Sequence, residues 1–404
     1  MQSDTRTKSA VASIVFVLLL IAGMYFPSVA SESFSIFSLS SFVIVLALLL
    51  VLIFRKHGHP AFFWCLALLS IAPLLLLFTV TSGLATLRLG AIFQYAVLSV
   101  MLIATFRDVI LPRWFGVLWD SINIVNLLGG FAIVAGFQAV NDFIVAHYST
   151  AYDDLVMNML SWHKPVLTFG THSLAAFFLY LFFWLNLQGY KRKGQKRLLG
   201  FAFCYIFLTA CLLSVSAVVF AAVGICQLAF HFWSSIRYKF VSALAVLCVV
   251  LFVGVFWGSA LNWRDSVDVV KGILQDPGAG LTGRISPGGT MYESLEYLKS
   301  HPFSPVGASI REGLVFGDDG PLEYALRGSI PLLLLVYGGL FYFLRRNLLL
   351  KSDAYFLFAA IVVFELGYTT LINIRALYLI PVFCAYLNTL AIDQSSSPAI
   401  SEAT

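Results

Sequence analysis

Long apolar runs recur along almost the whole chain and constrain its fold more than any other feature. The chain has 404 residues, 60% of them hydrophobic and 11% charged, whereas a soluble domain carries about 25% charged residues. A helix needs roughly 20 mostly apolar residues to cross a bilayer. Twelve such spans are predicted, at about 9–27, 36–54, 60–80, 84–106, 118–140, 166–188, 198–214, 217–233, 240–258, 323–344, 354–371 and 375–392. The sequence therefore predicts an all-α polytopic membrane protein.

Two of the apolar runs need further interpretation. The first apolar run is followed at once by another, so it is interpreted as a spanning helix and not as a cleaved signal peptide. The run over 198–233 is too long for one span, and two serines interrupt it within Leu213–Ser216. The sequence therefore predicts a break between two helices at that point.

The positions of the basic residues predict the orientation of the spans. With the N-terminus inside, most lysines and arginines fall in short cytoplasmic segments, as the positive-inside rule requires. The even number of spans places both termini in the cytoplasm. The isoelectric point near 8.8 follows from this orientation, so no nucleic-acid partner is expected. The remaining basic residues fall outside or in the outer parts of spans: Arg88, Lys164, Arg264, Lys271, Arg284, Lys299, Arg311, Arg327 and Arg375.

One long polar segment, residues 259–322, stands out from the apolar background. It is predicted to be a large external loop that contains short helices. Residues 1–258 hold the first nine spans and a smaller external loop at 141–165, residues 323–392 hold the last three spans, and a tail follows to residue 404. Because the large loop is the main polar surface, it is where chemistry is expected.

The stretch Asp276–Gly289 contains five glycines in fourteen positions and includes Arg284. Glycine lets backbone N–H groups approach a ligand without a side chain in the way. The pattern Thr290-Met-Tyr-Glu293 predicts a capped helix that runs to about Ser300. A helix N-terminus beside an arginine suits an anion, but an ordinary solvated turn with a capped surface helix has the same pattern. Both interpretations stay open.

Three acids, Asp318, Asp319 and Glu323, stand where the large loop re-enters the membrane. A carboxylate beside an apolar surface suits a general base, while acids at a helix N-terminus also complement its dipole. A fourth acid, Glu365, lies within a predicted span, and we expect it to pair with a nearby arginine. Arg327 is one candidate partner.

No metal site is expected from the histidines or cysteines. The spacing of His163 and His172 fits no standard zinc pattern. The six cysteines all lie in apolar runs, so neither a disulfide framework nor a thiolate site is predicted.

Several stretches together resemble a known family. They are GLTGR (280–284), YESLEYLKSHPFSPVGAS (292–309) and DDGPLEYALRGSIPLLLL (318–335), with KPVLTFGTHSLAAFF (164–178) and LLSVSAVVFAAV (212–223). These resemble the signature of the bacterial O-antigen polymerase and O-antigen ligase superfamily. The many predicted spans with one dominant external loop before the last of them also match that family.

The resemblance implies a membrane-embedded, GT-C-like glycosyltransferase of the bacterial inner membrane. Its donor and acceptor would be undecaprenyl-pyrophosphate-linked oligosaccharides, joined on the periplasmic face without a cofactor or a required metal. Membrane lipid and a polysaccharide chain-length regulator are further candidate partners. Relatives in the ligase branch carry a histidine just before the tenth span, where this chain has Asp318-Asp319-Gly320. This departure favours a polymerase.

The resemblance also implies roles for particular residues. Arg284 stands at the family's Gly-Arg position and would bind the donor pyrophosphate. Lys164 stands where many relatives have an arginine. The remaining expected pyrophosphate contacts are Arg88, Arg264 and Arg311, and the expected general base is Asp318 or Asp319, with His172 and Glu323 as further candidates.

Two alternatives remain. Within the same class, the chain would be an O-antigen ligase or a protein-directed oligosaccharyltransferase. From another class, it would be a flippase for the same lipid-linked glycan. Against the flippase, the sequence shows no paired interrupted spans at matching positions in two halves.

Overall fold

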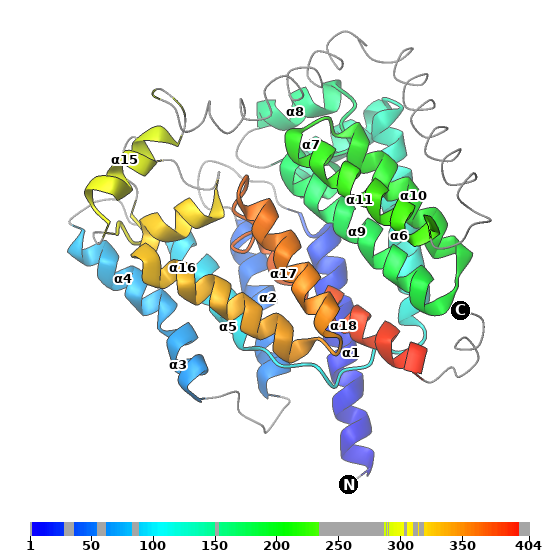
Figure 1. The fold of residues 1–404 in the computed structure, drawn as a ribbon, viewed down its shortest axis with the longest axis horizontal. Helices are drawn as coiled ribbons and strands as arrows, with labels where there is room; N and C mark the ends of the chain where they lie inside the picture. Colours follow the sequence, from blue (N-terminus) through cyan, green and yellow to red (C-terminus); the bar gives the residue numbers. More distant parts are fainter. Residues whose placement is uncertain are drawn as a thin grey trace. The chain divides into compact units, whose positions relative to one another are not determined.

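The computed structural model describes residues 2–27, 36–54, 62–82, 89–149, 153–233, 291–302, 305–309 and 319–395, with single positions at 287, 289 and 314. Helices and their connecting turns make up this part of the chain, and none of it forms a strand (Figure 1). The all-helical class expected from the sequence is therefore confirmed. The predicted span at 240–258 lies outside the described residues.

The helices carry the following bounds: α1 (Gln2–Tyr25), α2 (Ile36–Phe54), α3 (Phe62–Leu69), α4 (Ile71–Thr81), α5 (Leu89–Ile103), α6 (Phe115–Val134), α7 (Gln138–Tyr148), α8 (Asp153–Ser161), η1 (Leu167–Phe169), α9 (His172–Lys193), α10 (Lys196–Cys211), α11 (Val215–Trp233), α15 (Tyr292–Ser300), α16 (Gly320–Asn347), α17 (Lys351–Glu365) and α18 (Ile374–Ser395).

Four helices of the described chain, α6, α9, α16 and α18, are long and apolar enough to cross a membrane. They fall on four of the predicted spans. Several other predicted spans contain apolar helices of 10–17 residues, such as Gly90–Ile103, which are shorter than the roughly 20 residues of a full span. A count of twelve spans thus remains a prediction.

Residues up to Asp120 and from Pro287 onward form one compact unit. Within it, α18 packs closely on α1, since a Cβ atom at Gly23 would lie 2.7 Å from the Cβ of Tyr378. Arg375 donates to the carbonyls of Gly23 and Phe26 at 2.9 Å each. These carbonyls lie at the C-terminal end of α1, where no helical donor follows. Arg375 therefore caps α1.

Residues Ser121–Ser286 form the second compact unit. Helix α9 is its buried centre and packs against α10 and α11. The predicted break at Leu213–Ser216 is confirmed, since α10 ends at Cys211 and α11 begins at Val215. Leu213 has a φ of 48°, and the Ser214 hydroxyl accepts a hydrogen bond from the Ala217 N–H at 3.2 Å. The serine caps the new helix, which explains the break.

Candidate functional site

Helix α16 is broken near its N-terminal end. Gly328 and Ser329 have non-helical backbone angles, and Ser329 has a φ of 59° and a ψ of −166°. This region is occupied almost only by glycine, so the serine is strained. Two positions later Pro331 has no N–H to donate to the carbonyl of Arg327. The break therefore frees backbone groups inside an apolar helix, where each must find another partner.

Residues 305–309 supply the replacement donors. The Val306 N–H donates to the Leu326 carbonyl at 2.9 Å, and the Gly307 N–H donates to the Arg327 carbonyl at 3.1 Å. Val306 also packs with Leu322 and Leu326 in a small buried cluster. The hydroxyl of Ser329 donates to the carbonyl of Pro302. Hydrogen bonds thus join the loop segment to the broken helix.

The side chain of Arg327 adds further hydrogen bonds between the loop segment and α16. Its Nε donates to Glu323 Oε1 at 2.9 Å, and its Nη1 donates to the carbonyls of Gly307 and Ser309 at 2.9 Å each. Both Arg327 and Glu323 are 3% exposed. A buried ion pair offsets its desolvation only when further hydrogen bonds satisfy it. Here two backbone carbonyls do so, which fixes residues 307–309 against α16.

Helix α4 holds the other side of the loop segment. The Thr79 hydroxyl accepts a hydrogen bond from the Ala308 N–H at 2.7 Å and donates to the Leu75 carbonyl at 2.6 Å. Gly307 has a φ of 62°, and a Cβ atom there would lie 2.6 Å from the Leu75 carbonyl oxygen. Only glycine combines this backbone angle with this close approach.

We expect Gly307→Ala to loosen the docked segment and to lower the free energy of unfolding by about 2 kcal/mol or more, because it adds left-handed strain and a steric clash. Thermal unfolding of the purified protein in detergent measures this loss. Gly338→Ala is the matched control, since Gly338 lies in α16 with open space around it. Equal melting temperatures for the two variants would contradict the close approach.

Asp319 caps the N-terminus of α16. Its Oδ1 accepts a hydrogen bond from the Leu322 N–H at 2.7 Å, and its backbone is extended. The helix-capping interpretation of this acid is therefore confirmed, while its role as a general base remains a prediction. Glu323 lies one turn further along and uses Oε1 to bind Arg327.

The sequence-based expectation for Glu365 was wrong, because no arginine pairs with it in the described part of the chain. Its Oε1 accepts from the Tyr324 hydroxyl at 2.8 Å and from the N–H groups of Thr370 and Leu371, and its Oε2 accepts from the Tyr337 hydroxyl at 2.7 Å. The side chain is fully buried. The turn after α17 folds back onto the acid, so neutral donors replace the expected cation.

Sequence reasoning missed both tyrosines. Tyr324 and Tyr337 are thirteen positions apart, which on a straight helix would separate them by about 140° around the axis. The break at 328–329 lets both reach one carboxylate. The signal that could have found them is the Gly328-Ser329-Ile-Pro331 sequence, which predicts an interrupted helix.

The loop between α8 and α9, in the other unit, has a strained backbone. His163 and Leu167 have φ values of 55° and 51°, although a bulky residue such as leucine rarely adopts a positive φ. Gly136, with a φ of 77°, lies against the ring of His163. Backbone strain of this kind is often retained where a functional group must be held in place.

Lys164 lies in this loop and is half-buried. Its ammonium group has no hydrogen-bond or ion-pair partner among the described residues, and burial lowers its pKa. The Thr168 hydroxyl and the Asn141 side-chain oxygen are also buried without a partner in the described part of the chain. Helix α7, which carries Asn141, packs against η1, which carries Thr168. A half-buried cation with no anionic partner among the described residues is suited to an anionic ligand.

His172 begins α9, directly after the cap residue Thr171, whose hydroxyl accepts from the Leu174 N–H at 3.2 Å. Lys164 and His172 therefore flank η1 in one unit. In the other unit, Asp319 caps the N-terminus of α16 and Glu323 lies in its first turn. The remaining predicted site residues lie outside the described residues: Arg88, Arg264, Arg284, Arg311 and Asp318.

The helix predicted to end near Ser300 is present as α15 (Tyr292–Ser300), but its start differs from the prediction. Its N-cap residue is Met291, which makes no side-chain capping bond. The helix begins one residue later than the pattern at Thr290 indicates, because the Tyr292 N–H bonds to the carbonyl of Gly289 in a preceding turn. Thr290 itself lies outside the described residues.

The described residues contain no group of three or more His, Cys, Asp or Glu side chains arranged to hold a metal. In comparisons with known proteins, no family model, no curated protein and no solved structure matches the chain. The described residues form an all-helical fold, in which four helices could span a membrane.

Proposed function

We propose that the protein is a glycosyltransferase that polymerises undecaprenyl-pyrophosphate-linked oligosaccharide repeat units of an O-antigen or related surface polysaccharide. One observation carries the proposal. The segments 305–309 and 319–331, which belong to separate parts of the family-like signature, are held together by Arg327 and by two backbone hydrogen bonds. Residues that share a signature because they build one site are expected to meet in this way.

The chemistry of the reaction agrees with the charged groups present. The leaving group is the undecaprenyl pyrophosphate of the donor, so the enzyme must neutralise negative charge on it as the glycosidic bond breaks. Lys164, which has no anionic partner in the described chain, is suited to that task, together with Arg284. The acceptor hydroxyl loses its proton to a carboxylate, for which Asp318 and Asp319 are the proposed candidates.

Deletion of the gene in its host, followed by gel separation of the surface glycan, tests the proposal. A polymerase predicts loss of the long ladder with a single repeat unit retained. Complete polymer that accumulates on the carrier lipid would instead indicate a ligase. Loss of all surface glycan, with the lipid-linked unit trapped inside, would indicate a flippase.

At the level of residues, Arg284→Ala is expected to abolish the ladder while the protein still inserts into the membrane, because the donor pyrophosphate loses its main contact. Lys299→Ala is the control, since Lys299 is an exposed lysine that forms a surface ion pair with Glu296 at 2.6 Å. Exposed pairs of this kind contribute little to stability. A normal ladder from Arg284→Ala would overturn the assignment of the pyrophosphate contact.

A further inference from the structure

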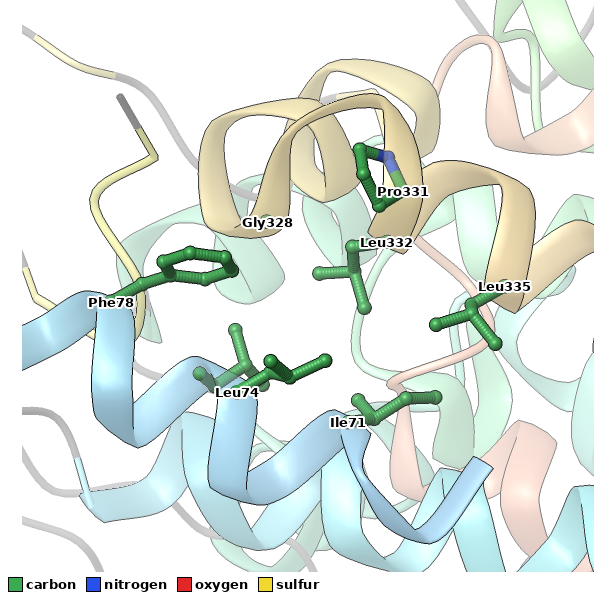
Figure 2. A pocket seen from close by; sticks show the side chains of 8 residues that line it. Ile71, Leu74, Phe78, Gly328, Pro331, Leu332 and Leu335 are labelled. Carbon is green, nitrogen blue, oxygen red and sulfur yellow. The ribbon is translucent and has the colours of Figure 1, made fainter. Parts of the chain in front are cut away.

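A cavity of about 260 Å³ lies beside the break in α16, between that helix and α4 (Figure 2). Figure 2 shows Phe78 of α4 and Leu332 of α16 pointing into the space between the two helices. The lining residues are Ile71, Leu74, Leu75, Phe78, Gly328, Pro331, Leu332 and Leu335. The cavity lies at the break, since Gly328 and Pro331, which belong to the interrupted turn of α16, are among the residues that line it.

Water is a poor occupant of this space. A buried water needs two to four polar partners, and the wall of the cavity consists of apolar atoms. The carbonyls of Leu326 and Arg327, which the break could have offered, already accept from Val306 and Gly307. An empty cavity would also forfeit dispersion contacts along its wall. Hydrocarbon is the filling that matches the lining.

The surroundings of the cavity indicate where that hydrocarbon comes from. The cavity is partly open, and the apolar surface continues onto the outer faces of both helices. Val80 of α4 is 72% exposed and Leu334 of α16 is 66% exposed. Side chains of this kind on a membrane helix contact the acyl chains of the bilayer. Leu334 directly precedes Leu335, which lines the cavity.

We infer that this cavity binds an acyl chain of a membrane glycerophospholipid. The lipid enters sideways from the bilayer, and its chain fills the space between α4 and the broken part of α16. The bound chain supports the helix break, and so it supports the docked segment 305–309 on the far side of Leu75. This lipid site goes beyond the proposed transferase function and does not depend on it, because its occupant is neither donor nor acceptor.

Native mass spectrometry tests the inference directly. The purified full chain is stripped of lipid in mild detergent and titrated with dioleoyl phosphatidylglycerol. The unmodified protein is expected to retain one lipid. Leu335→Trp fills the cavity and is expected to weaken that binding at least tenfold. Leu334→Trp is the matched control, because the same change on the neighbouring exposed residue leaves the cavity open.

A second pair of variants, on the α4 wall of the cavity, keeps the test valid if Leu335→Trp does not fold. Leu74→Phe reduces the cavity from α4, and Leu76→Phe places the same side chain on an exposed position of that helix. Each variant is first checked for a single symmetric peak in size-exclusion chromatography. Equal lipid retention in a cavity variant and its control overturns the site. So does an isoprenoid, instead of a phospholipid, retained by protein purified directly from membranes. Because the readout is a mass, its result is separate from the gel test of the polymerase.

Discussion

Arg327→Met is expected to leave little folded protein. The substitution keeps the length of the side chain but removes every donor, so Glu323 stays buried without its cation and two backbone carbonyls lose their partner. Removing one member of a buried ion pair costs about 3–5 kcal/mol, a large fraction of the roughly 5–15 kcal/mol by which a domain is stable. Expression of a fluorescent fusion and its elution profile in detergent measure the loss.

Two further variants separate the ion pair from a general effect of losing an arginine. Arg345→Met removes an arginine from the last turn of the same helix, where the guanidinium lies 5.2 Å from the ring centre of Tyr355, and it is expected to cost about 1 kcal/mol. The double variant Glu323→Gln/Arg327→Met is expected to recover part of the loss, because no unpaired charge remains. If Arg327→Met alone elutes and melts like the wild-type protein, the hydrogen bonds of Arg327 do not hold the docked segment on α16.

The sequence predicted much of the helical framework because burial and chain breaks have local signatures. The apolar runs located α9 and α18, and the serines after Leu212 located the break before α11. Likewise, acids at the start of the tenth span were expected to complement the helix dipole, and Asp319 caps α16 there. Each of these features depends on residues within a few positions of one another.

The partners of buried polar groups were not predictable in the same way. Besides its partner Glu323 on the same helix, Arg327 binds the carbonyl of Ser309, 18 positions away. Besides two nearby backbone N–H groups, Glu365 accepts a hydrogen bond from Tyr324, 41 positions away. Those pairings depend on how far α16 bends at Ser329 and on where residues 305–309 pack against it. Neither quantity has a local signature in the sequence. The apolar runs therefore indicate that Glu365 is buried but not which groups satisfy it.

Lys164, which has no ion-pair partner among the described residues, affects stability in a way that depends on pH. Burial lowers the pKa of Lys164 below the value of about 10.4 that it has in the unfolded chain. Between those two values the unfolded state binds more protons, so the free energy of unfolding rises with pH through that window. At neutral pH the protonated amine therefore opposes folding, unless an anion binds beside it.

Lys164→Met is accordingly expected to separate stability from function. The variant should melt at the same temperature as the wild type or up to about 2 °C higher, because the desolvated charge is gone and an unbranched apolar chain replaces it. The same variant should make long glycan roughly 100-fold less efficiently, the scale of losing one group that stabilises a developing anion. Thermal unfolding in detergent and the glycan ladder in a deletion strain measure the two effects.

Lys196→Met is the control for this separation, because Lys196 is an exposed lysine at the start of α10 in the same unit. It should change neither the melting temperature nor the ladder. A marked fall in the melting temperature of Lys164→Met would show that the ammonium group has a structural partner. A full ladder from a stable Lys164→Met protein would show that the donor pyrophosphate binds elsewhere. Unchanged or higher stability together with a lost ladder is expected only if the half-buried cation is kept for a ligand.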